Sequence, residues 1–315
     1  PEDRGRIATV VIDTHGEYTS FADDQAYSNR TKVFPLSDIR IGLPKLSAYH
    51  IGAMTGLTGP QLRELNKIMR DMKGSYGMSD LMKSIESREG MPQKTKDILL
   101  SELESLASTG LFGAYDYPQT EELATPGRLA VVDMSETIDM KRKQIVVSYL
   151  ARRLFDSRRA GEVPPFMLLL EEAHQYVPEK VKREQALCRG ILQTIAREGR
   201  KFNASLCLVS QRPVQLSTTI LSQCNTNIIL RVTNPYDLKH IGESSEGITK
   251  DVLDQISSLQ VGTGLIVGEA VNFPLFVKIR RRKSKESEKG LPLEQAALEF
   301  RKKREQKKED TKQFM

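Results

Sequence analysis

"FMLLLEEAH", Phe166 to His174, is the stretch that decides the fold of this chain. Its five apolar residues follow a Pro-Pro break and lie between two helical patterns. This arrangement is typical of a strand that is buried on both faces of a parallel sheet. Two adjacent acids, Glu171 and Glu172, end the strand. Open α/β sheets bind their ligands at the carboxyl ends of the strands, so these acids mark a candidate site.

Strand and helix patterns alternate along the rest of the chain. Two helical patterns, at residues 138–160 and 181–198, are each followed by a glycine, Gly161 and Gly199, that is expected to end the helix. This alternation predicts right-handed crossovers and an α/β fold with a largely parallel, doubly wound sheet. Further segments rich in β-branched or apolar residues predict strands at 6–13, 128–133, 204–211, 226–232 and 264–270, with 274–279 as a candidate hairpin partner of the last.

The same patterns divide the chain into four parts. Residues 1–38 and 127–280 carry the strand patterns and are predicted to form one core. Residues 39–126 lack a strong strand pattern and show helical periodicity, which predicts a helical insertion. Residues 281–315 form a basic tail rich in Lys, Arg and Glu.

Positive charge is concentrated near the carboxyl end of the chain. From Lys278 onward, 14 Lys and Arg residues stand against 7 Asp and Glu residues, a net +7, so the preceding residues carry −1 of the total of +6. A segment of this kind can contact nucleic-acid phosphates with salt-dependent affinity. The alternative is a solvated helical extension with mixed charges. The sequence does not decide between this extension and a nucleic-acid contact.

Composition excludes several classes of protein. A chain of 315 residues with 39% hydrophobic and 28% charged content is typical of one large or two smaller globular domains. No apolar run approaches the roughly 18 residues of a membrane span, and "PEDRGR" at the start has no signal-peptide character. We therefore expect a cytoplasmic protein without a membrane partner. The three cysteines are far apart, which argues against a disulfide framework or a structural zinc site.

The paired acids predict a magnesium-dependent reaction at a phosphate. One carboxylate at the end of a buried strand can hold Mg²⁺, and its neighbour can orient or deprotonate the water that attacks a γ-phosphate. In this interpretation Glu171 holds the metal and Glu172 acts on the water. The alternative is that the pair begins a solvent-exposed loop or helix.

Further polar residues are predicted at the same edge of the sheet. Ser210 and Gln211 end the next predicted strand, where a polar side chain could sense the γ-phosphate. Arg197 and Arg200 lie at the end of the preceding helical pattern. An arginine there could enter the nucleotide site of a neighbouring subunit and stabilise transition-state charge. The alternative is that positive side chains simply favour a helix C-terminus.

A phosphate cradle of the form G-x-x-x-x-G-K-[ST] does not occur in the sequence. In doubly wound nucleotide-binding sheets this cradle follows the first strand, so its segment is expected before Arg6. We therefore expect that an upstream portion is missing from this chain and that the chain by itself is inactive as an ATPase.

Four separated motifs resemble those of HerA, the archaeal family of hexameric DNA translocases within the HerA and FtsK superfamily. They occur in the family's order and, with the segments between them, span most of the chain. The motifs are "VVIDTHGEY" at Val10 to Tyr18, "LLLEEAHQYVP" at Leu168 to Pro178, "IAREGRKFNASLCLVSQRP" at Ile195 to Pro213 and "GTGLIVGEAVNFPLFVKI" at Gly262 to Ile279.

The resemblance implies a RecA-like fold and a role for each matching residue. Glu171 and Glu172 match the family's Walker B acids, and Gln211 matches its sensor position. Arg197 best matches the arginine that is supplied in trans, with Arg200 as the second choice. "DTHGEY" matches the turn after the phosphate-loop helix, which places Asp13, His15 and Glu17 near the nucleotide. An Asp and a His could equally shape a tight turn through local hydrogen bonds.

The resemblance also implies a function. Six copies would form a ring, with ATP and Mg²⁺ bound between neighbours, and hydrolysis would move double-stranded DNA through the central channel. With a NurA-type nuclease as partner, this motor feeds DNA-end resection. Family members also carry an N-terminal β-barrel and a phosphate loop, and neither matches a segment of this sequence. Lys180, Lys182 and Arg183, just after the acidic strand, are candidate DNA contacts, or they are ordinary surface charges of a helix.

Two other functions stay open from the sequence. The missing phosphate loop allows a non-catalytic module that forms a ring or binds DNA. A superfamily motor that pumps protein or conjugative DNA through a membrane is disfavoured, because no spanning segment is present.

Overall fold

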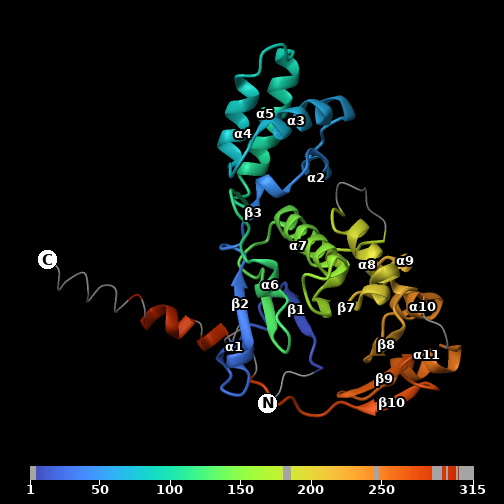
Figure 1. The fold of residues 1–315 in the computed structure, drawn as a ribbon. Coiled ribbons are helices and arrows are strands. Elements are labelled where there is room, and N and C mark those ends of the chain that lie inside the picture. The colour runs from blue at the N-terminus through green and yellow to red at the C-terminus, as the bar shows by residue number, and fades with distance from the viewer. Residues whose placement is uncertain are drawn as a thin grey trace.

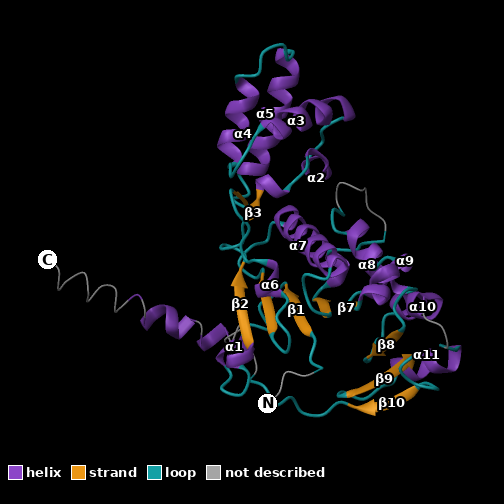
Figure 2. Ribbon diagram, in the orientation of Figure 1, coloured by secondary structure: helices purple, strands orange, loops and turns teal. Residues whose placement is uncertain are grey.

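A five-stranded parallel sheet lies at the centre of the computed structural model, which describes residues 5–179, 186–244, 248–285, 293–295, 297–302 and 304. Its strand order is β2-β5-β1-β6-β7. Figures 1 and 2 show the sheet with β2 at one side and β7 toward the other. This confirms the predicted α/β fold with a parallel sheet. The strands are β1 (Ala8–Asp13), β2 (Thr31–Pro35), β5 (Leu129–Asp133), β6 (Phe166–Leu170) and β7 (Ala204–Leu208).

The register of the sheet brings the strand ends together. Ile12 of β1 lies opposite Leu170 of β6, and Leu170 lies opposite Leu208 of β7. All of these pairs are parallel, so the residues that follow β1, β6 and β7 emerge at one edge. The segments "DTHGEY", "EEAH" and "VSQRP" are therefore neighbours in space although they are far apart in the sequence.

Helices α7 (Met140–Ala160) and α8 (Arg189–Phe202) pack against each other, and α8 packs on β7 (Figure 1). The carboxylate of Asp139 caps the start of α7 by accepting the N–H groups of Lys141 and Arg142. Gly161 ends α7 in the left-handed conformation with φ 80°, as predicted.

Gly199 does not end its helix, and the prediction that it would is wrong. α8 continues to Phe202, and Asn203 takes the left-handed conformation with φ 54°. Gly199 has a different role, because a Cβ there would lie 2.2 Å from the carbonyl oxygen of Ala204. The glycine permits the close approach of α8 to the start of β7. Residues 189–198 of the predicted 181–198 pattern are confirmed as helix. Residues 186–188 are not helical, which corrects the start of the prediction, and 181–185 lie outside the described ranges.

The residues between β2 and β5 are mainly helical and stand beyond one end of the sheet (Figure 1). The short strands β3 and β4 pair with each other where this segment leaves and rejoins the core. The exact boundaries of the predicted insertion, 39–126, stay a prediction. The elements of this segment are β3 (Ile41–Gly42), α2 (Ala48–Met54), α3 (Gly59–Asp71), α4 (Met78–Glu86), α5 (Gln93–Ala107), β4 (Phe112–Gly113) and α6 (Thr120–Leu123).

Asp116 joins this helical segment to α7. Its Oδ1 accepts hydrogen bonds from the Gly42 N–H at 2.7 Å and from the Tyr149 hydroxyl at 2.6 Å. Its Oδ2 lies 2.9 Å from Lys45 Nζ and 3.5 Å from Arg153 Nη1. Burial pushes the pKa of Asp116 up, but the hydroxyl, the N–H group and the two cations together hold it below its ordinary value.

Asp116→Asn is expected to lower the free energy of unfolding by roughly 1 to 3 kcal/mol, because it removes the charge that satisfies a buried network. The matched control is Asp71→Asn, since Asp71 forms an exposed ion pair with Arg88 at 2.8 Å. That change is expected to have an effect within about 0.5 kcal/mol. Urea denaturation of the two variants measures the difference. Equal effects would show that the Asp116 network does not stabilise the junction.

The last three strands form a separate sheet, which corrects the expectation of one sheet for all strands. β8 (Thr226–Ile229), β9 (Thr263–Gly268) and β10 (Leu275–Lys278) pair antiparallel in the order β10-β9-β8. The predicted hairpin of 264–270 with 274–279 is confirmed. This sheet encloses a small core of its own with α10 (Pro235–Ser244) and α11 (Lys250–Ser257).

Two short helices and the tail complete the described structure. They are α1 (Ser20–Asp23), which follows the loop after β1, and α9 (Thr218–Leu221), which follows the loop after β7. After β10 the chain returns to α1, where the Lys285 N–H donates to Asp24 Oδ2 at 2.8 Å. Residues 293–295 and 297–302 are helical, and their described side chains are exposed.

Candidate functional site

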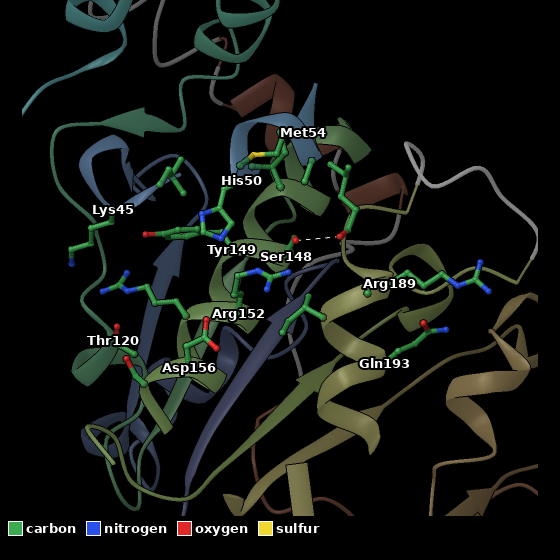
Figure 3. A pocket seen from close by; sticks show the side chains of 18 of the residues that line it. Lys45, His50, Met54, Thr120, Ser148, Tyr149, Arg152, Asp156, Arg189 and Gln193 are labelled. Carbon is green, nitrogen blue, oxygen red and sulfur yellow. Dashed lines mark hydrogen bonds between the residues drawn. The ribbon is translucent and has the colours of Figure 1, made fainter. Parts of the chain in front are cut away.

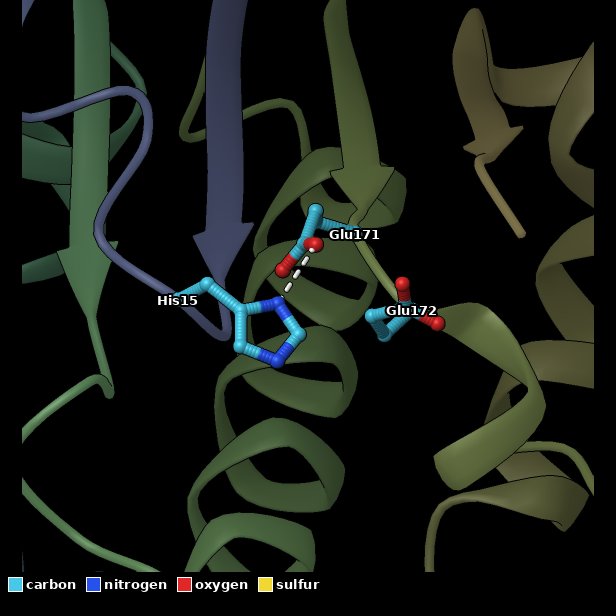
Figure 4. A group of neighbouring side chains, drawn as sticks. All are labelled: His15, Glu171 and Glu172. Carbon is cyan, nitrogen blue, oxygen red and sulfur yellow. Dashed lines mark hydrogen bonds and ion pairs between the residues drawn. The ribbon is translucent and has the colours of Figure 1, made fainter. Parts of the chain in front are cut away.

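Glu171 and Glu172 directly follow β6 and are both buried, with 6% and 7% of their surface exposed. The alternative that they begin a solvent-exposed segment is therefore wrong. His15, from the loop after β1, lies beside them (Figure 4). One ligand atom from each of these three residues lies within 4.8 Å of the others. Carboxylate oxygens are the ligands that Mg²⁺ prefers, so the two acids fit a hard divalent cation.

The loop after β1 is tied to Glu171 at three points. The Thr14 N–H donates to Glu171 Oε2 at 2.9 Å, and the Thr14 hydroxyl donates to the Glu171 carbonyl oxygen at 3.1 Å. His15 Nδ1 lies 2.9 Å from Glu171 Oε1. The Tyr176 hydroxyl, fully buried, lies 3.0 Å from the Thr14 hydroxyl. These contacts fix Glu171 between the ends of β1 and β6.

Asp13 builds this loop. Its Oδ1 accepts the N–H groups of Gly16 at 2.7 Å and Glu17 at 3.0 Å, and its Oδ2 accepts that of Tyr18 at 2.8 Å. Burial raises the pKa of the Asp13 carboxyl, although the three N–H groups act against this. The sequence left a cofactor contact and a turn-forming role open for this segment, and the structure shows the turn-forming role for Asp13. The side chain of Glu17 is exposed.

His15 is half exposed, and its hydrogen bond with Glu171 raises the pKa of the imidazole above its ordinary value, while burial acts weakly against this. A raised pKa means that the protonated ring stabilises the folded state below the unfolded pKa of about 6.5. This contribution of His15 to stability is lost as the pH rises through the pKa that His15 has in the folded protein.

His15→Gln is therefore expected to destabilise the chain more at about pH 6 than at about pH 9. The measurement is urea denaturation of both proteins at the two pH values in EDTA, which keeps metal binding out of the comparison. A difference between the two proteins that does not change with pH would contradict the His15–Glu171 ion pair.

Glu172 has an unusual backbone conformation. With φ 51° and ψ 44° it is left-handed, which costs a non-glycine residue about 1 to 2 kcal/mol and is concentrated at functional sites. Its Oε2 lies 3.0 Å from His174 Nδ1, and the same nitrogen lies 3.1 Å from the Ser210 hydroxyl. Burial lowers the pKa of His174, while the carboxylate of Glu172 acts against this.

Lys143 of α7 is a residue of the site that the sequence did not reveal. Its side chain is buried, and its Nζ lies 3.4 Å from the Thr14 carbonyl oxygen. Burial lowers the pKa of Lys143, while the charges of Glu171 and Asp133 raise it. Lys143 lies in a helix pattern with several other basic residues, so no signal in the sequence distinguished it. Thr14, His174 and Tyr176 were also missed, although all three lie within the motif strings.

The other predicted residues are placed less tightly. Ser210 lies in the loop after β7, which ends at Leu208 rather than at the predicted residue 211, and the structure brings it to His174. Gln211 is exposed in the same loop, and Arg197 and Arg200 are exposed on α8. The structure does not bring these three into contact with the acids. Lys180, Lys182 and Arg183 lie outside the described residues.

A cavity of about 780 Å³ lies elsewhere, between the helical segment and helices α7 and α8 (Figure 3). Its walls mix apolar and charged side chains, among them Met54 and His50 of α2, Tyr149 and Arg152 of α7, and Gln193 of α8. His15, Glu171 and Glu172 do not line it. We place the candidate chemistry at the strand ends because buried carboxylates converge there.

Comparisons with solved structures support the fold. The chain is similar to VirB4 of Thermoanaerobacter pseudethanolicus, with a TM-score of 0.66 and 14% sequence identity, covering 89% of this chain and 83% of that one. Identity this low shows the fold alone, and it is the RecA-like fold of the expected class. Among the described helices, none combines the length and the apolar content that crossing a bilayer requires.

Comparisons of sequence show which proteins the chain is similar to. Residues 3–154, just under half of the chain, match the family model for the central domain of helicase HerA. The DNA double-strand break repair helicase HerA of Saccharolobus solfataricus is 40% identical over 160 residues, which cover 49% of this chain and 31% of that protein. A probable helicase of Methanocaldococcus jannaschii is 29% identical over 304 residues, covering 87% of this chain and 57% of that protein. Over the residues that these matches cover, the chain is similar to the HerA family, and it spans less than two thirds of the length of either relative.

Proposed function

We propose that this chain is the core of an ATP-driven translocase and helicase on double-stranded DNA. The observation that carries the proposal is the pair of buried carboxylates at the carboxyl end of β6, tied to the ends of β1 and β7 in a RecA-like sheet. The relative from S. solfataricus, named a DNA double-strand break repair helicase, supports DNA as the substrate.

Each residue of the site has a proposed task. Glu171, with both oxygens held by Thr14 and His15, would hold Mg²⁺, which neutralises charge that develops on the phosphates. Glu172 would orient the attacking water and accept its proton. Its left-handed backbone turn places the carboxylate at the sheet edge, where a nucleotide in a fold of this class lies.

Binding of the phosphates needs groups that the sequence does not contain, because no G-x-x-x-x-G-K-[ST] string is present. We place the phosphate loop on a further parallel strand beside β7, the edge strand of the described sheet. Such a strand would lie about 4.8 Å from β7 and end at the same edge as the acids. This chain would then hydrolyse ATP only together with that strand.

Assembly into a homohexameric ring would complete the site. The guanidinium groups of Arg197 and Arg200 are exposed on α8, so they are available to the nucleotide of a neighbouring subunit. Heterologous contacts that close a ring let each subunit serve the next one. In the cytoplasm, such a ring would supply DNA ends to a NurA-type nuclease for resection.

The test is ATP hydrolysis by the full-length protein with and without linear duplex DNA. Duplex DNA is expected to raise the turnover, because a motor couples hydrolysis to its track. Turnover that is the same with and without DNA would sink the translocase proposal.

A second candidate is a DNA-binding module without catalysis, which the charge near the carboxyl end favours. Residues 278–285 contain six Lys and Arg and no acid, whereas residues 286–315 contain eight against seven acids. The charge excess therefore lies at the end of β10 and just after it, in a segment that the structure describes as exposed around Arg280 to Arg282.

Replacing Arg280, Arg281 and Arg282 with Gln is expected to weaken DNA binding and to reduce the slope of log K against log salt by about 2 to 3, if each arginine contacts a phosphate. The matched control replaces Arg301, Lys302 and Arg304, which lie where the charges are mixed, and is expected to change the slope by less than about 1. Equal slopes for native protein and the Arg280 to Arg282 variant would exclude this segment from DNA binding.

A further inference from the structure

His174 Nδ1 has two partners, which come from different strand ends. Glu172 Oε2, at the end of β6, lies 3.0 Å away, and the Ser210 hydroxyl, in the loop after β7, lies 3.1 Å away. The side chains of Glu172 and His174 are 8% and 12% exposed, so water can replace little of this contact. His174 is the side chain through which the candidate catalytic acid reaches the neighbouring strand.

The two contacts of Nδ1 differ in kind. The approach of Nδ1 to the Ser210 hydroxyl has the geometry of a hydrogen bond, whereas the approach to Glu172 Oε2 is a close contact with a carboxylate that lacks this geometry. Ser210 therefore sets the direction of Nδ1, and a change in the position of Ser210 changes the contact of the same nitrogen with Glu172.

The backbone holds His174 in this place. The Ala173 N–H donates to the Val209 carbonyl oxygen at 2.9 Å, which joins the turn after β6 to the end of β7. Ser210 is linked to its own loop, because its hydroxyl oxygen accepts the Arg212 N–H at 3.0 Å. A movement of the loop after β7 thus changes the distance from Ser210 to His174 directly.

The loop after β7 is attached to a second part of the molecule. The Val214 N–H donates to Asp237 Oδ1 of α10 at 2.9 Å, and His240 Nε2 lies 3.1 Å from the Leu216 carbonyl oxygen. The helix α10 that holds this loop packs with the antiparallel sheet. A displacement of that sheet can therefore move Ser210, because a few hydrogen bonds connect the two.

We propose that His174 is the positioning residue of Glu172 and that it couples this carboxylate to the loop after β7 through Ser210. The proposal rests on the proposed function, in which Glu172 acts on the attacking water. With Ser210 close, the hydrogen bond to Ser210 directs Nδ1 away from Glu172, and the carboxylate is held only by the contact at 3.0 Å. With Ser210 withdrawn, the ring can turn Nδ1 toward Glu172 and hold the carboxylate in one orientation.

The first test replaces His174 in the full-length protein with two amides of different reach. The side-chain nitrogen of His174→Asn can occupy the position of Nδ1, whereas that of His174→Gln reaches the position of Nε2 instead. His174→Gln is expected to lower kcat for ATP by about 10- to 100-fold with little change in KM, because the acid is misplaced while the nucleotide still binds. His174→Asn is expected to recover most of that loss.

The second test asks whether His174 acts through Glu172. In a protein that already carries Glu172→Gln, the further change His174→Gln is expected to have no effect on kcat, because the carboxylate that His174 would position is no longer present. Independent losses that multiply would overturn the proposal. So would a loss in His174→Gln that His174→Asn does not reverse, which would indicate a merely structural role.

The outcomes separate the two proposals. If Glu172→Gln hydrolyses ATP as fast as the native protein, the proposed function fails. If Glu172→Gln is inactive and His174→Gln is as active as the native protein, the function stands and the positioning role is wrong.

A spectroscopic measurement does not depend on hydrolysis. Nitrogen-15 NMR of the native chain is expected to show the His174 hydrogen on Nδ1, and Ser210→Ala is expected to shift that signal. A ring with the hydrogen on Nε2 and a bare Nδ1 would overturn the proposal.

Discussion

Glu172→Gln is expected to reduce ATP hydrolysis by the full-length protein by about 10²-fold or more, while nucleotide binding is retained. Glutamine has the size of glutamate and can stay in the left-handed turn after β6, but it cannot accept a proton from water. Glu172 is 7% exposed, so solvent cannot readily replace its carboxylate. The measurements are kcat in the presence of duplex DNA and the affinity for a fluorescent nucleotide.

The matched control is Glu198→Gln, because Glu198 is an exposed acid on α8. Its hydrolysis is expected to stay within about twofold of the native rate. If Glu172→Gln loses nucleotide binding together with hydrolysis, Glu172 holds the ligand rather than the water, and its assigned task is wrong.

Arg197→Ala is expected to lower kcat by about 10³-fold or more, since an arginine that stabilises transition-state charge contributes a factor of this size. The side chain is exposed on α8 and so can serve a neighbouring subunit. Mixing Arg197→Ala subunits with Glu172→Gln subunits is expected to restore part of the activity. At some interfaces of a mixed ring, one subunit supplies an intact Glu172 and its neighbour an intact Arg197.

Two further variants test which arginine acts. Arg200→Ala is expected to have a smaller effect than Arg197→Ala, and Lys201→Ala, at the exposed end of the same helix, is expected to have almost none. A large loss in Arg200→Ala alone would reassign the role to Arg200. A failure of the mixed subunits to recover activity would argue against supply in trans.

The sequence predicted the central strands of the sheet because buried positions require apolar residues, and runs of such residues are visible in the sequence. The apolar run of β6, followed by two acids, was sufficient to place the strand and to mark its end as a candidate site. β2 was missed because Thr31, Lys32 and Pro35 dilute its two apolar residues, and an edge strand does not need a continuous apolar run.

Other features depend on partners that a local pattern does not contain. β8, β9 and β10 were recognised as strands, but periodicity does not tell which sheet a strand joins. Gly199 matched the pattern of a helix end, yet its role is the contact with the Ala204 carbonyl oxygen. His174 meets Ser210, which lies 36 residues further along the chain, and this contact appears only after β6 and β7 have paired.

The most direct test of the account is displacement of a third strand from duplex DNA by the full-length protein. With ATP and Mg²⁺, the native protein is expected to displace the third strand, and neither Glu172→Gln nor a non-hydrolysable ATP analogue is expected to support displacement. Salt-dependent binding to the duplex without displacement under any condition would contradict the translocase function and leave a DNA-binding module.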